Sequence, residues 1–150
     1  GSRNNSKPLL EINMPADHVG YLDHNERIRR LQSARCMFQN HQLDIEASGR
    51  NFELKIYGIP FPDVESISEL PGKSFGPESE AMKSDPIAEG GIEFTDSYLS
   101  WESLTLRCKS HNAANNTLSI SFQGEVSDPE WGNRGSVDGS VVCEIQDSLR

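Results

Sequence analysis

The sequence predicts an all-β fold, an antiparallel β-sandwich or open barrel of about six to eight strands with one short helix. Apolar and polar side chains alternate in six separate runs, glycine and asparagine cluster between several of them, and one stretch has the spacing of a helix. Alternation is typical of strands that bury one face and expose the other. The alternative is an α+β fold in which that helix packs on an antiparallel sheet.

The alternating runs define the expected strands. They are residues 10–14, 43–48, 52–57, 104–109, 118–123 and 141–146, with shorter strands expected at 92–95 and 98–101. Gly49 lies between two runs and the asparagine-rich segment 111–116 joins two others, and both residue types tolerate the left-handed backbone of tight turns. We therefore expect hairpins over residues 42–58 and 104–123, lying next to each other in the sheet.

The expected helix covers residues 24–35. Asp23 is a suitable N-cap and Glu26 follows three residues later, which is the spacing of a capping box. Ile28 and Leu31 are three residues apart and would share the inward face. The same stretch is rich in arginine, at Arg27, Arg29, Arg30 and Arg35. We interpret these arginines as a solvated helix face that suits the C-terminal dipole, with a patch for a phosphate or an acidic partner as the alternative.

Length and composition indicate one globular domain over residues 4–150 of the 150-residue chain. Residues 1–3, Gly-Ser-Arg, resemble the remnant of an expression tag, and a signal peptide that has been removed remains an alternative. Two long loops are expected, the proline-rich stretch 59–91 and the segment 127–139. Loops of this length in a compact domain are uncommon unless they carry function or are disordered.

The net charge of -9 lies almost wholly in the second half of the chain. Residues 76–150 hold 5 basic and 13 acidic side chains, a net charge of -8. Nucleic-acid binding needs clustered Lys and Arg for the phosphates, so we expect no nucleic-acid partner. No apolar run approaches the ~20 residues that span a bilayer, so we expect no membrane partner either.

Cys36, Cys108 and Cys143 are an odd number of cysteines at low density. Cys108 and Cys143 fall on the apolar phase of expected strands, which favours buried reduced thiols, with a disulfide between these two as the alternative. Reduced thiols favour a reducing compartment, and we expect a cytoplasmic protein.

Motifs for catalysis are missing from the sequence, so we expect neither an enzyme nor a bound cofactor or metal. There is no Gly-x-Ser-x-Gly elbow and no pair of cysteines with zinc-site spacing. A small barrel enzyme with a deep pocket around His41 or Cys36 is the least favoured alternative.

The remaining features favour a soluble, non-enzymatic binding module, most readily for a basic protein. Small acidic bacterial proteins that neutralise a basic toxin or nuclease bind in this way, and the likeness is one of physical type. The expected site is the loop that carries Trp131, Asp128 and Glu130, with Tyr57 and Trp101 as further aromatic contacts, because Trp and Tyr bury much area at low entropic cost. Binding of a carbohydrate or small ligand is the alternative, and a homo-oligomer is also compatible with the sequence.

Overall fold

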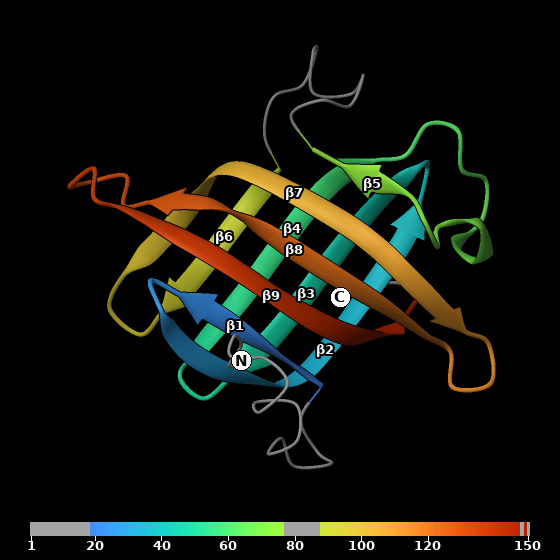
Figure 1. Cartoon of the computed structure of the whole chain (residues 1–150), viewed down its shortest axis with the longest axis horizontal. Helices are drawn as coiled ribbons and strands as arrows, with labels where there is room; N and C mark the ends of the chain where they lie inside the picture. Colours follow the sequence, from blue (N-terminus) through green and yellow to red (C-terminus); the bar gives the residue numbers. More distant parts are fainter. Residues whose placement is uncertain (1–18, 77–87, 148, 150) are drawn as a thin grey trace, which may run out of the picture.

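In a computed structural model, which describes residues 19–76, 88–147 and 149, the chain forms an antiparallel β-barrel (Figure 1). The strands are β1 (Gly20–His24), β2 (Arg27–Gln39), β3 (Gln42–Gly49), β4 (Phe52–Pro60), β5 (Ser74–Phe75), β6 (Glu89–Phe94), β7 (Tyr98–Asn112), β8 (Thr117–Ser127) and β9 (Arg134–Ile145). A single 3-10 turn, η1 (Ile67–Glu69), lies between β4 and β5.

The barrel closes because β7 and β8, the two strands at the ends of the spatial order, pair with each other. Neighbouring strands follow the order β7-β6-β4-β3-β2-β1-β9-β8, and β8 pairs back onto β7 from Ser100↔Ser127 to Asn112↔Thr117. Eight strands therefore form the barrel, and β5 is an extra strand that pairs with β7 at Phe75↔Leu106. β1 is short, and beyond it β2 and β9 meet in a brief parallel contact at Cys36↔Ile145.

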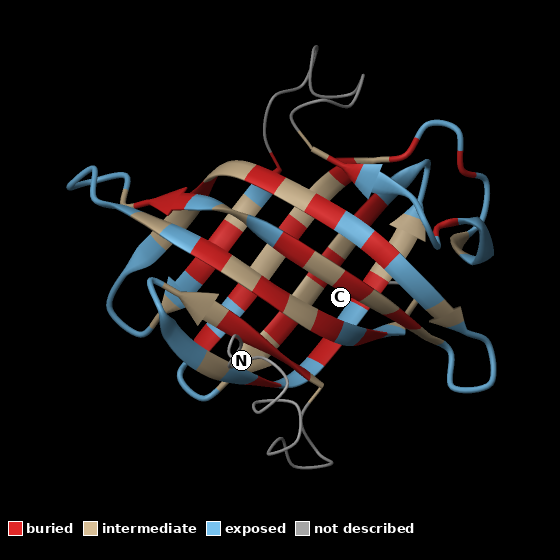
Figure 2. Cartoon of the chain, viewed as in Figure 1, coloured by how far each residue is buried: buried red, intermediate tan, exposed pale blue. Residues whose placement is uncertain are grey.

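The interior of the barrel is filled by side chains. Buried residues alternate with more exposed ones along much of β3, β4, β7, β8 and β9, which gives the chequered pattern of Figure 2. The largest side chains that are fully buried are Phe75, Leu22, Leu31, Leu43, Ile45, Leu54, Ile56, Ile59, Leu70, Ile92, Leu104 and Leu106. A barrel of eight strands has an interior just wide enough for side chains to fill it, whereas barrels with more strands can enclose a channel. The interior of this barrel is therefore a hydrophobic core.

The all-β prediction is confirmed, and the described residues contain no α-helix, so the α+β alternative is wrong. The predicted strands from residue 43 onward are present, and the stretches 98–101 and 104–109 both belong to β7, which has a bulge between Trp101 and Ser103. The run at 10–14 and the tag-like residues 1–3 lie outside the described residues. No helix in the described ranges is long and apolar enough to cross a membrane.

The helix predicted over residues 24–35 is wrong, because this segment is the hairpin of β1 and β2. Ile28 and Leu31, which the sequence predicts to share an inward helix face, do not do so, because Leu31 is fully buried whereas Ile28 is 42 % exposed. A β-bulge between Leu31 and Ser33 then shifts the inward phase of β2, so that Ala34 is the next residue to face the core. Asn25 and Glu26 form the turn with positive φ values of 53° and 68°.

Three other expectations need correction. The two predicted hairpins are present but not adjacent, because β6 lies between β4 and β7. The loop predicted over 127–139 is shorter, since β9 begins at Arg134 and buries Val137. The stretch 59–91 contains η1, β5 and the start of β6, and its residues 77–87 lie outside the described part.

The filled interior predicts a large effect of truncating a core side chain. Leu106→Ala should lower the free energy of unfolding by about 2–5 kcal/mol, because Leu106 is fully buried and leaves a cavity. Urea denaturation followed by tryptophan fluorescence measures this change. Lys109→Ala, at an exposed position of the same strand, should change the free energy by less than about 0.5 kcal/mol. Equal effects of the two substitutions would contradict the inward placement of Leu106.

Candidate functional site: the loop end of the barrel

One end of the barrel gathers four of the chain's connections, and we call it the loop end. These connections are the turns at residues 25–26, 50–51 and 95–97 and the loop 128–133. The loop end is on the left in Figure 1, whereas β5 and η1 lie towards the right. Because the interior is filled, the surface of the barrel and its two ends are the places where a partner can bind.

The loop between β8 and β9 holds Trp131 in a defined position. Oδ1 of Asp128 accepts the backbone N–H of Glu130 at 2.8 Å and that of Trp131 at 3.2 Å. Two backbone bonds tighten the loop further, from Gly132 N to Asp128 O at 2.7 Å and from Asp128 N to Asn133 O at 2.9 Å. Trp131 is nevertheless 78 % exposed. Asp128 therefore shapes the loop, and Trp131 and Glu130 are the side chains that the loop presents.

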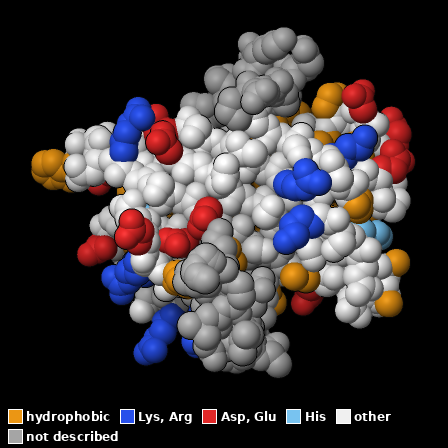
Figure 3. Space-filling model, viewed as in Figure 1, with side chains coloured by type: hydrophobic (Ala, Val, Ile, Leu, Met, Phe, Trp, Pro, Cys, Tyr) orange, Lys and Arg blue, Asp and Glu red, His pale blue; other side chains and the backbone are white. Residues whose placement is uncertain are grey.

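Next to this loop, acidic side chains line a groove of about 580 Å³ on the outer face of β1, β9, β8 and β7. We call it the acidic groove and define it by Asp23, Glu26, Glu125 and Asp138. Asp23 and Asp138 are direct partners in the β1–β9 register. This register places two carboxylates side by side on the outer face of the barrel. Acidic atoms gather on the left half of this face in Figure 3.

Arg134, at the start of β9, only partly neutralises this surface. Its Nη2 lies 3.6 Å from Oε1 of Glu102, and its Nη1 lies 3.7 Å from Oε1 of Glu125. The hydroxyl of Ser127 donates to Oε2 of Glu102 at 2.5 Å. One guanidinium therefore serves two carboxylates, and the surface stays negative.

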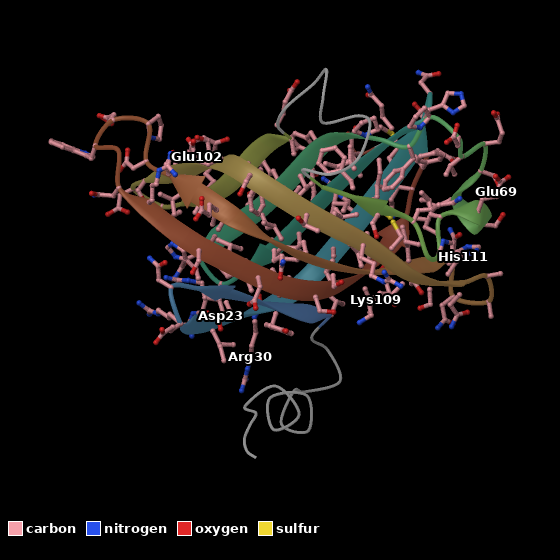
Figure 4. All side chains as sticks on the ribbon, turned by 45° about the horizontal axis from the view of Figure 1, so that its top comes forward. Asp23, Arg30, Glu69, Glu102, Lys109 and His111 are labelled. Carbon is pink, nitrogen blue, oxygen red and sulfur yellow. The ribbon has the colours of Figure 1, made fainter. Side chains whose placement is uncertain are left out.

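On the same outer face, the side chains near the other end of the barrel include positively charged ones. A neighbouring hollow of about 470 Å³ is lined by Arg107, Lys109 and the outward face of β9 at Asp138. Figure 4 shows Asp23 and Glu102 on the loop-end side and Lys109 and His111 on the opposite side. This polarity gives a charged partner a preferred direction along the groove.

Tyr57, which the sequence predicts to be a binding residue together with Trp131, lies away from Trp131 in the structure. It is a half-buried residue of β4, and its hydroxyl donates to Oε2 of Glu46. Burial and the Glu46 carboxylate raise the pKa of Tyr57 above its ordinary range. Tyr57 lines a separate hollow of about 710 Å³ with Asp44 and Glu89. The fold therefore does not bring Tyr57 together with the Trp131 loop.

Trp101, the other aromatic residue predicted to contact a partner, is buried in the core and cannot serve as a surface contact. It is only 3 % exposed, and its ring packs edge-on against Phe122 at a centroid distance of 6.5 Å. Its indole Nε1 donates to the backbone oxygen of Lys55 at 2.9 Å. Trp101 shares the alternation phase of Leu99, so the sequence already contained the signal for an inward side chain.

Sequence reasoning missed the acidic groove. The sequence assigns Asp23 and Glu26 to helix capping, groups Asp138 with Asp128 and Glu130 in one acidic loop, and gives no role to Glu125. Asp23 meets Asp138 only because β1 inserts next to β9. The outward phase of Asp138, between Val137 and Gly139, was a usable signal.

The three cysteines are buried free thiols, as predicted. The thiol of Cys143 donates to the backbone oxygen of Leu118 at 3.3 Å. Burial, with a contribution from Cys36, raises the pKa of Cys108 to about 12, so this thiol stays protonated at neutral pH. Protonated buried thiols are poor nucleophiles.

Cys36 and His41, the two residues of the suggested enzyme pocket, both have structural roles in the fold. Cys36 is fully buried in the core, and Nδ1 of His41 lies 2.8 Å from the backbone oxygen of Val64. Within the described ranges, no group of three His, Cys, Asp or Glu side chains is placed to hold a metal ion.

Comparison with protein-family models, with curated proteins and with solved structures gives no match for this chain. The site must therefore be interpreted from its own geometry and charge.

The buried thiols lead to a direct chemical prediction. At pH 8 the native protein should leave all three cysteines unmodified by Ellman's reagent, because each is buried and the pKa of Cys108 is raised to about 12. In guanidinium chloride all three should react. Rapid modification of the native protein would contradict the burial of these side chains.

Proposed function

We propose that this protein is a binding module that recognises a basic segment of another protein at the loop end. Trp131 serves as the apolar anchor, and the acidic groove provides the complementary charge. The single observation that supports the proposal is the 78 % exposure of a tryptophan held by a tight loop that joins β8 and β9, two of the strands that line the groove.

The energetic argument combines two contributions. A rigid tryptophan loses little conformational entropy when it is buried, which makes it a typical hot spot of protein interfaces. The carboxylates of the groove steer a basic partner and fix its register, chiefly by raising the rate of association. The facing pair Asp23 and Asp138 places two carboxylates at one point of the groove, where a Lys or Arg of the partner could bind.

The experiment begins with affinity capture by the purified protein at low salt, followed by binding measurements with each captured partner. Trp131→Ala should weaken the affinity about 30-fold, the effect of losing a hot spot of about 2 kcal/mol. Val142→Ala is the matched control, because Val142 is also an exposed apolar side chain, on the outer face of β9. Unchanged affinity of the Trp131 variant would contradict the proposal.

The charge contribution needs its own variants. The double substitution Asp23→Asn with Glu125→Gln should slow association and flatten its dependence on salt, because it removes two groove carboxylates. The pair Glu65→Gln and Glu69→Gln removes the same charge near η1 and should change the rate little. Glu130→Lys tests the exposed charge of the loop, whereas a substitution of Asp128 would also disturb loop geometry.

Carbohydrate binding is the second candidate, and one observation favours it. Tyr98, at the start of β7, is 39 % exposed and lies at the same end of the barrel as Trp131. Aromatic rings of this kind can stack on sugars. A glycan array on which Trp131→Ala and Tyr98→Ala each abolish the signal would favour this function over the protein partner.

A further inference from the structure

The loop end also carries a cluster of positively charged arginines, separate from the acidic groove. β2 extends beyond β3, whose last paired residue is Gly49, opposite Leu31, so residues 27–30 pair with β1 alone. A notch of about 370 Å³ remains between this stretch and the turn that follows β3. We call it the arginine notch, and it is lined by Arg27, Ile28, Arg29, Arg30, Gln32, Arg50 and Phe52.

None of the four arginines in the notch has a carboxylate partner among the described residues. Arg27, Arg30 and Arg50 are exposed, and none of them forms an ion pair within the described part of the chain. Arg35, further along β2, pairs with Glu46 at 2.8 Å. The chain carries 23 acidic residues, so the unpaired arginines do not reflect a shortage of acids. Four guanidinium groups around one notch repel each other, and a bound anion would relieve that repulsion.

Arg29 is the inner wall of the notch and is fixed by aromatic rings. Its guanidinium carbon lies 4.8 Å from the ring centroid of Phe94 and 5.8 Å from that of Phe52. Its Nε is buried and has no hydrogen-bond partner. Burial and the charge of Arg27 lower the pKa of Arg29, which indicates an environment that lacks a compensating anion. Stacking occupies the face of a guanidinium and leaves its in-plane N–H donors for a ligand.

We propose that the arginine notch is a binding site for a soluble phosphorylated compound that carries at least two phosphate charges. Arginine pairs with phosphate oxygens through two parallel N–H donors, and four arginines exceed what a single phosphate neutralises. The notch volume falls within the range of small-ligand sites. Ile28, which is 42 % exposed, and the amide of Gln32 offer apolar and polar contacts to the organic part of the ligand.

Because the protein as a whole is negatively charged, binding of an anion would indicate a local positive site. A chain with a net charge of -9 repels anions on average, so binding of a polyphosphate requires a local positive site. The site is independent of the proposed protein interface, which uses carboxylates and Trp131. Lys and Arg atoms also gather at the lower left of Figure 3, below the acidic groove, and Arg30 points away from the barrel in Figure 4.

The test is isothermal titration calorimetry of the full chain with sodium tripolyphosphate, at constant ionic strength and with sodium sulfate as the reference anion. We expect one binding site for tripolyphosphate, and at least about tenfold weaker binding for each of Arg30→Gln and Arg50→Gln. Both residues are exposed, and circular dichroism verifies that the variants keep the fold of the wild type.

The control variants are Arg107→Gln and Lys109→Gln, which remove the same charge from the hollow on the outer face of β7. They should leave the affinity within about twofold of the wild type. Equal weakening by the controls, equal affinity for sulfate, or the absence of heat with tripolyphosphate would each overturn the proposal. Binding to phosphatidylglycerol vesicles without binding to tripolyphosphate would overturn the assignment to a soluble ligand.

Discussion

The pairing of β7 with β8 closes the barrel, and the rest of the molecule depends on that closure. It removes the two free edges that an open sheet would present, and it brings the inner faces of all the strands against one another. Leucine, isoleucine and phenylalanine side chains from the strands are then buried in the space that the barrel encloses. Because the core is filled, the sites that we propose lie on the outer face and at one end of the barrel.

At the loop end, one hairpin separates two kinds of charge. The hairpin of β1 and β2 places Asp23 and Glu26 on the side of the acidic groove, where β9 and β8 provide further carboxylates. Beyond the turn, the overhang of β2 past β3 exposes arginines on the other side. Opposite charges thus lie close together in sequence but face different hollows. The two sites that we propose, one for a basic protein segment and one for an anionic compound, therefore lie at separate places on this end of the barrel.

Much of the fold could be predicted from alternation, because each strand buries one face in a continuous core. The hairpin over 24–35 could not be recognised, since Asp23 and Glu26 have the spacing of a capping box and Ile28 and Leu31 that of a helix face, although Ile28 is exposed in the structure. The exposed Trp131 was found from its Gly- and Pro-rich loop, while the acidic groove was not. Asp23 and Asp138 are far apart in sequence, and only the strand order brings them together.

The most direct test of the closed, filled barrel compares the solvent exchange of the two tryptophan indole N–H groups by NMR. Trp101 donates its indole N–H to the backbone oxygen of Lys55 inside the barrel, whereas Trp131 is 78 % exposed on the loop. The account predicts rapid exchange at Trp131 and strong protection at Trp101, limited by opening of the barrel. Comparable exchange rates at the two indoles would contradict a closed core and the assignment of binding to its outside.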